Sequence, residues 1–63
     1  MNAFSTLQST LAWWVEVSLS ATHHTYHLGP FKSREEAKLS RGAHVDVLYH
    51  QKATDIVALL KQR

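Results

Sequence analysis

The chain of 63 residues contains no cysteine, one proline and two glycines. Without cysteine it can form neither a disulfide nor a zinc site built on thiolates, which are common supports of very small domains. A chain of this length buries only about 60% of its unfolded surface, so its stability is marginal. Good packing, self-association or a protein partner therefore has to stabilise it. The absence of cysteine is also typical of a reducing, cytoplasmic location.

A strong charge of one sign and long apolar runs are missing as well. Seven basic residues face five acidic ones, interspersed along the chain, and the net charge is +2 with histidine neutral. This balance is far from that of a nucleic-acid-binding arm or a polybasic membrane patch. No apolar stretch approaches the ~20 residues of a membrane span, and the N-terminus lacks the basic start of a secretory signal. The composition predicts one small cytoplasmic domain, residues 1–63.

The first segment, residues 2–11, carries an apolar stripe. Phe4, Leu7 and Leu11 recur at the spacing i, i+3 and i+7, which predicts one or two turns of amphipathic helix. A helix this short is unstable alone and has to dock on its own domain or on a partner. These three residues are therefore candidates for partner binding.

The next segment, residues 12–20, reads AWWVEVSLS and alternates with period two. This alternation of β-branched, aromatic and polar residues predicts a strand. Its two faces carry, respectively, Trp13, Val15, Val17 and Leu19, and Trp14, Glu16, Ser18 and Ser20.

A second strand is predicted at residues 24–28, because Tyr26 and Leu28 share one face while Thr25 and His27 share the other. The short connection over residues 21–23 makes the two strands a β-hairpin. The Gly29-Pro30 pair is expected to end the second strand, since proline removes a ladder donor and glycine permits a sharp turn.

A helix start is encoded at Ser33-Arg34-Glu35-Glu36, which has the form of a capping box. The Ser33 hydroxyl can accept from the Glu36 N–H, and the Glu36 carboxylate can reach back to Ser33. We expect the helix to run to about residue 51, with Gly42 allowing close approach to the sheet. Its buried stripe would be Ala37, His44, Val45 and Leu48, interrupted by Arg41. An exit turn (52–55), a third strand (56–60) and a solvated tail (61–63) would follow.

The element order predicts an α+β domain: a short N-terminal helix (1–11), then a ββαβ core (12–63) with one helix on one face of a three-stranded sheet. The other face would have no cover from this chain. It would expose Trp14, Glu16 and His27. The third strand would add either Val57 and Leu59 or Ile56, Ala58 and Leu60. An exposed tryptophan beside aliphatic side chains indicates a contact surface, so these three residues are the leading partner-binding candidates.

The chain resembles a group of very short cyanobacterial proteins classed as a domain of unknown function. Their signature runs WWVEI, then a TYYFGPF-like segment, then S..EA at a helix start. The matching residues here are Trp13, Trp14, Val15, Glu16 and Val17, followed by Thr25, Tyr26, Leu28, Gly29, Pro30, Phe31, Ser33, Glu36 and Ala37. The sequence departs from the pattern at His27, where the family has an aromatic residue, and at HVDVLYHQKA, where the family helix is acidic.

The resemblance implies a regulatory protein without enzymatic activity. It also implies a partner of the PII type, the nitrogen-status signalling protein, and so a role in nitrogen/carbon signalling. A photosynthetic or phycobilisome assembly, or a second copy of the chain, is an alternative partner. The family offers no catalytic or ligand residues to transfer to this sequence.

The histidines His23, His24 and His27 raise the question of a metal site. In a strand, neighbouring side chains point to opposite faces and residues four apart are separated by about 13 Å. Metal ligation requires nitrogens that converge to about 2.0–2.1 Å from one ion, and these rings diverge. We therefore predict neither a metal site nor another cofactor.

Catalysis is not predicted either. There is no cysteine nucleophile, and no serine lies in a nucleophile-elbow pattern. Glu16 and His27 could face each other across the hairpin, but such pairs are usually surface ion pairs.

Nucleic-acid binding is a weaker alternative to protein binding. The basic residues Lys32, Arg34, Lys38 and Arg41, with Trp14 and Tyr26, superficially resemble a base-stacking surface. Three acidic residues nearby (Glu35, Glu36 and Asp46) dilute that strip, and the aromatic RNA-binding motif is missing. We therefore predict a small non-enzymatic adaptor that acts by protein–protein binding.

Overall fold

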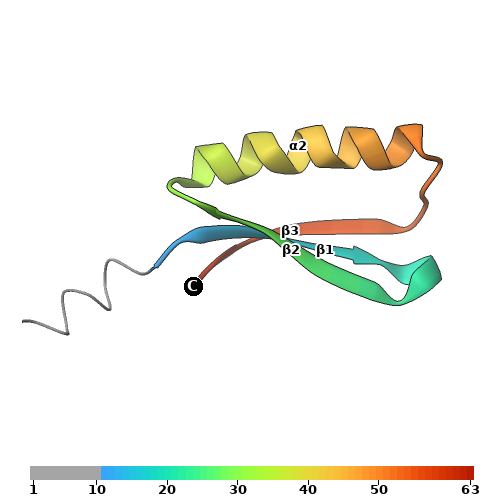
Figure 1. Ribbon diagram of the computed structural model, residues 1–63, viewed down its shortest axis with the longest axis horizontal. Helices are drawn as coiled ribbons and strands as arrows, with labels where there is room; N and C mark the ends of the chain where they lie inside the picture. The colour runs from blue at the N-terminus through green and yellow to red at the C-terminus, as the bar shows by residue number, and fades with distance from the viewer. Residues whose placement is uncertain (1–10) are drawn as a thin grey trace, which may run out of the picture.

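The computed structural model describes residues 11–63. They form strand β1 (Trp13–Leu19), the 3-10 turn η1 (Ser20–Thr22), strand β2 (His24–Phe31), helix α2 (Arg34–His50) and strand β3 (Ile56–Gln62). The sheet order is β2-β1-β3, both pairings are antiparallel, and α2 covers one face (Figure 1). The ββαβ prediction is confirmed. The predicted N-terminal helix, with Phe4 and Leu7, lies outside the described residues.

The core lies between the central strand and the helix. Val15 and Val17 of β1 are fully buried, and they meet Ala37 and Leu48 of α2. A central strand with neighbours on both sides suits β-branched residues, which pack well on a pleated surface. The surrounding half-buried shell consists of Trp13, Leu19, Tyr26, Leu28, Phe31, Ala53, Ile56, Ala58 and Leu60.

Strand β2 does not end at Gly29-Pro30 as predicted; it continues to Phe31. The register changes by one residue between the pairs Val15↔Leu28 and Trp13↔Phe31, which marks a β-bulge. β2 lies at the edge of the sheet, where a proline need not donate to a ladder, and bulges tolerate proline and glycine. The Gly29-Pro30 pair therefore marks a β-bulge and not the end of the strand.

The start of α2 confirms half of the capping box. The Glu36 N–H donates to Ser33 Oγ at 3.1 Å. The Glu36 carboxylate, however, accepts from the N–H of Lys32 at 3.3 Å, one residue before the predicted donor Ser33. The helix then runs to His50, and no helix within residues 11–63 has the length and apolarity needed to cross a membrane.

Gly42 does not bring α2 close to the sheet, so that prediction was wrong. It is exposed on the helix surface, and a Cβ built on it would meet no atom within 4 Å. The residues that allow close packing are on the opposite side of the helix, at Ala37 and Leu48.

Strand β3 extends beyond residue 60, so residues 61–63 are not a solvated tail. Lys61 and Gln62 pair with β1, and the backbones of Ala12 and Arg63 exchange two hydrogen bonds of 3.0 and 2.9 Å. The structure also settles the alternation of β3: its core-facing residues are Ile56, Ala58 and Leu60, and Val57 and Leu59 point away from α2.

Candidate functional site: the open face of the sheet

The face of the sheet opposite α2 has no cover from any described residue; we call it the open face. The strand register brings eight side chains onto it. They are Trp14, Glu16, Ser18, Thr25, His27, Val57, Leu59 and Lys61. Trp14, Glu16 and His27 therefore share one surface, as predicted from the alternation of the hairpin.

A charged cluster crosses all three strands at the middle of the open face. Glu16 Oε1 accepts from His27 Nε2 at 3.2 Å and from Lys61 Nζ at 3.3 Å. These hydrogen bonds, from Lys61 first and His27 second, lower the pKa of the Glu16 carboxyl. All three side chains remain in contact with solvent, so their ion pairs are screened and contribute modestly to stability.

Trp14 is half-buried rather than fully exposed, because its own chain covers part of the ring. Its Nε1–H donates to the carbonyl oxygen of Arg63 at 3.2 Å, and the Arg63 guanidinium carbon lies 5.9 Å from the ring centroid. The ring also lies against Gly29, where a Cβ would be 3.0 Å from Trp14 Cε3. Trp14 on β1 therefore contacts both neighbouring strands, at Gly29 of β2 and at Arg63 directly after β3. These contacts do not depend on a partner.

Apolar side chains complete the open face along β3. Val57 lies opposite Ser18 and Leu59 lies opposite Glu16, and both aliphatic side chains are 46% exposed. Aliphatic side chains therefore lie beside the Glu16 cluster on one surface. Exposed apolar patches of this kind often mark interaction sites.

Of the other candidates, Leu11 is described and is 59% exposed. Lys61 and Arg63 were predicted to lie in a solvated tail, so their contacts with Glu16 and Trp14 were not predicted from the sequence. A signal was present, because Val57, Leu59 and Lys61 continue one period-two pattern past residue 60.

The histidines are dispersed. His23 occupies a left-handed turn position (φ 52°) and His27 contacts Glu16. His24 lies beside Tyr26, with the rings tilted by 48° and their centroids 5.7 Å apart. On the helix side, the Tyr26 hydroxyl hydrogen bonds to His44 Nε2 and joins β2 to α2. Within residues 11–63, no three acidic, histidine or cysteine side chains are grouped so that they could hold a metal ion.

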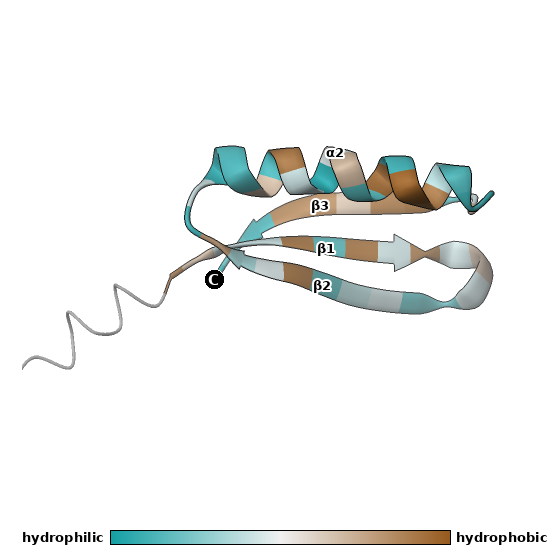
Figure 2. Cartoon of the chain, turned by 45° about the horizontal axis from the view of Figure 1, so that its top comes forward, coloured by the Kyte–Doolittle hydropathy of each residue, from teal (hydrophilic) through white to brown (hydrophobic). Residues whose placement is uncertain are grey.

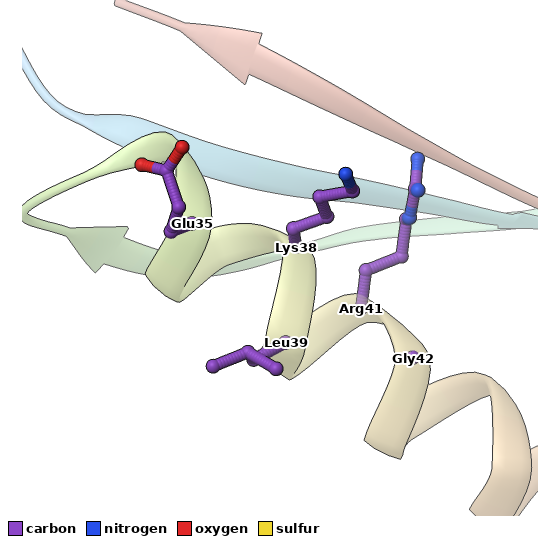
Figure 3. A pocket seen from close by; sticks show the side chains of 5 residues that line it. All are labelled: Glu35, Lys38, Leu39, Arg41 and Gly42. Carbon is purple, nitrogen blue, oxygen red and sulfur yellow. The ribbon is translucent and has the colours of Figure 1, made fainter.

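A shallow depression of about 500 Å³ lies on α2 itself (Figure 3). All of its lining residues come from this one helix: Glu35, Lys38, Leu39, Arg41 and Gly42. Gly42, which has no side chain, is one of them, and no other described element lines the depression. This depression is therefore part of the outer helix surface rather than an enclosed ligand site.

Comparison with known proteins identifies one family. Residues 6–63 match the model of a family described as a domain of unknown function (DUF1816). No curated protein and no solved structure matches the chain.

Proposed function

The chain belongs to the DUF1816 family, and from that premise we propose that it is a small non-enzymatic adaptor or regulatory protein. It acts by binding another protein through the open face. The observation that carries this proposal is the pair Val57 and Leu59, each 46% exposed beside the Glu16 cluster on a face that no described residue covers. Burying these side chains against a partner is favourable by about 25 cal/mol per Å² of apolar surface.

The charges of the open face favour a partner of defined chemistry. Lys61 and Arg63 border the aliphatic patch, while Glu16 is the one carboxylate within it. A complementary surface would carry an apolar patch rimmed by acidic side chains, because opposite potentials speed encounter and exclude wrong partners.

A PII-type signalling protein and a phycobilisome or photosynthetic component remain the predicted partner classes. They derive from the resemblance to short cyanobacterial proteins. Cytoplasmic location and a role in nitrogen/carbon signalling belong to the same proposal.

Two exposed residues make a sharper test than Trp14, whose removal would also loosen the fold. The variant Val57→Lys/Leu59→Lys makes the aliphatic patch charged. Lysine is chosen rather than glutamate because residue 59 lies opposite Glu16, which a second carboxylate would repel. A matched control, Leu39→Lys/Val47→Lys, makes the same change at exposed positions of α2. Both double variants should keep the thermal unfolding midpoint within a few degrees of the parent, since the altered residues are exposed.

The full chain with an N-terminal affinity tag would be the bait in native cell extract, and co-purified proteins would be quantified by mass spectrometry. We expect one protein to be captured by the parent and by the α2 control, and lost by at least ten-fold with the open-face variant. Equal capture by all three baits would refute the open-face proposal. A concentration-dependent dimer lost only in the open-face variant would instead identify a second copy as the occupant.

A further inference from the structure

Within residues 11–63, no strand pairs with the outer edge of β3. The ladder to β1 shows which backbone groups point outward from that edge. Residues Ala12 and Arg63 exchange both backbone hydrogen bonds, and the Ser20 N–H donates to the Asp55 carbonyl at 3.3 Å. In an antiparallel ladder such bonded pairs alternate with unbonded ones. Odd-numbered residues of β3 therefore bond to β1. The outward N–H and C=O groups belong to Ile56, Ala58, Leu60 and Gln62.

This edge lacks the usual devices that prevent strand addition. β3 is seven residues long, apolar from Ile56 to Leu60, and contains no proline. The opposite edge, on β2, carries Pro30 and the bulge and is largely hydrophilic (Figure 2). Proteins normally protect an exposed apolar edge with proline, a bulge or charge, since it is a template for another strand. Only Lys61, at its far end, brings charge to β3.

The flank of α2 above this edge is basic. The Tyr26–His44 hydrogen bond fixes the His44 side of the helix over β2. At about 3.6 residues per turn, Lys38, Arg41 and Val45 form one stripe along the helix. This stripe is rotated from His44 toward the other flank, over β3. Figure 3 shows the Lys38 and Arg41 side chains extending from the same side of the helix. Because Phe31 pairs with Trp13 and Trp13 with Gln62, the start of α2 lies near the end of β3.

Lys38 and Arg41 have no ionic partner among the residues that the structure describes. Among residues 11–63 the ion pairs within 4.0 Å are those of Glu16, so Lys38 and Arg41 form none. Glu35 shares their surface without pairing with them. A second copy of the chain would bring its own Lys38 and Arg41 to the edge, and its β3 strand carries no carboxylate between Ile56 and Gln62.

We propose that the outer edge of β3 receives an extended acidic segment of another protein as a fourth strand. Its backbone would pair with the outward groups of Ala58 and Leu60. Its carboxylates, on every second residue, would face the α2 side of the sheet and lie below Lys38 and Arg41. This site is separate from the open face, because it uses the edge of the sheet and the helix flank.

The probe is an acetylated nine-residue peptide that alternates valine and glutamate, added to the full ¹⁵N-labelled chain. Hydrogen exchange followed by NMR should show fast exchange of the Ala58 and Leu60 amides in the free chain and slow exchange of those of Val57 and Leu59. The peptide should slow the Ala58 and Leu60 amides at least ten-fold. The same peptide with lysine in place of glutamate should not.

Two variants test the parts of the site. Ala58→Pro removes one outward N–H without removing a bond to β1, and should abolish the protection at Leu60. Lys38→Glu/Arg41→Glu should weaken peptide binding at least ten-fold, whereas the matched reversal Lys32→Glu/Lys52→Glu should weaken it less than three-fold. The open-face variant Val57→Lys/Leu59→Lys should still bind the peptide, which separates this proposal from the preceding one.

Several results would overturn the proposal. The first is equal binding of the lysine peptide. The second is slow exchange at Ala58 and Leu60 in the free chain, which would mean that residues 1–10 or a second copy already covers the edge. The third is binding of a ten-nucleotide oligothymidine that depends on Lys38 and Arg41 while the acidic peptide leaves the β3 amides unprotected, which would assign the basic flank to nucleic acid.

Discussion

Trp14 lies directly against Gly29 of the neighbouring strand. A Cβ at Gly29 would be 3.0 Å from Trp14 Cε3 and 3.1 Å from the carbonyl oxygen of Trp13, and the Gly29 backbone has φ +133°. Both the contact and the backbone angle exclude a side chain. We expect Gly29→Ala to lower the free energy of unfolding by about 1–3 kcal/mol, measured by urea denaturation. An unchanged free energy of unfolding would show that the Trp14 ring moves aside without cost.

Gly42 should respond in the opposite direction. A glycine inside a helix costs roughly 0.5–1 kcal/mol relative to alanine, and a Cβ at this position meets nothing within 4 Å. Gly42→Ala should therefore raise the free energy of unfolding by about that amount in the same urea experiment. A loss of stability would mean that residues outside 11–63, or a second copy, occupy the space above Gly42.

Replacements of Trp14 separate its two intramolecular roles. Trp14→Phe keeps a ring against Gly29 but loses the hydrogen bond to the Arg63 carbonyl, at a cost of about 0.5–1.5 kcal/mol. Trp14→Ala also loses the packing of the ring, and should cost about 1–3 kcal/mol, less than a fully buried tryptophan. Thermal unfolding of the three proteins tests this order. Equal unfolding midpoints would show that Trp14 does not stabilise the fold, which would leave partner binding as its remaining proposed role.

The Glu16 cluster predicts a pH-dependent part of the stability. Hydrogen bonds from Lys61 and His27 lower the Glu16 pKa in the folded chain below its ordinary value of 4.5. The stabilisation is therefore present above about pH 4.5 and is lost as pH falls through the lowered value. The difference in unfolding free energy between the parent and Glu16→Gln should shrink as the pH is lowered from 6 to 3, roughly the span around this pKa. It should also be smaller in 1 M salt, where the Debye length is about 3 Å and the charges are screened. A difference that stays constant over that range would exclude the ionised cluster as its source.

Much of the fold was predictable from the sequence, because several of its elements depend on local sequence patterns. The alternation at Trp13–Leu19 and the Ser33 cap identified β1 and the start of α2, and both depend on residues close in sequence. The predictions failed where distant pairing decided the outcome. β2 continues through Pro30 because it is an edge strand with a bulge, and β3 reaches Gln62 because Trp13 and Trp14 pair with it.

The same limit applies to the candidate site. The sequence placed Trp14, Glu16 and His27 on one face, because period two is fixed by strand geometry. It could not show that Lys61 reaches Glu16, because that contact joins segments 45 residues apart (61 less 16) in a ladder set by tertiary pairing.

Local sequence patterns were enough to predict the element order, the covered and open sides of the hairpin, and membership of the family. Each depends on local periodicity, capping chemistry or residue identity. Strand register and tertiary packing were needed to show that Val57 and Leu59 share the open face, that Gly42 faces away from the sheet, and that β3 lies at an edge of the sheet. Those outcomes depend on strand order and register, which arise when separate segments bury a common core around Val15 and Val17.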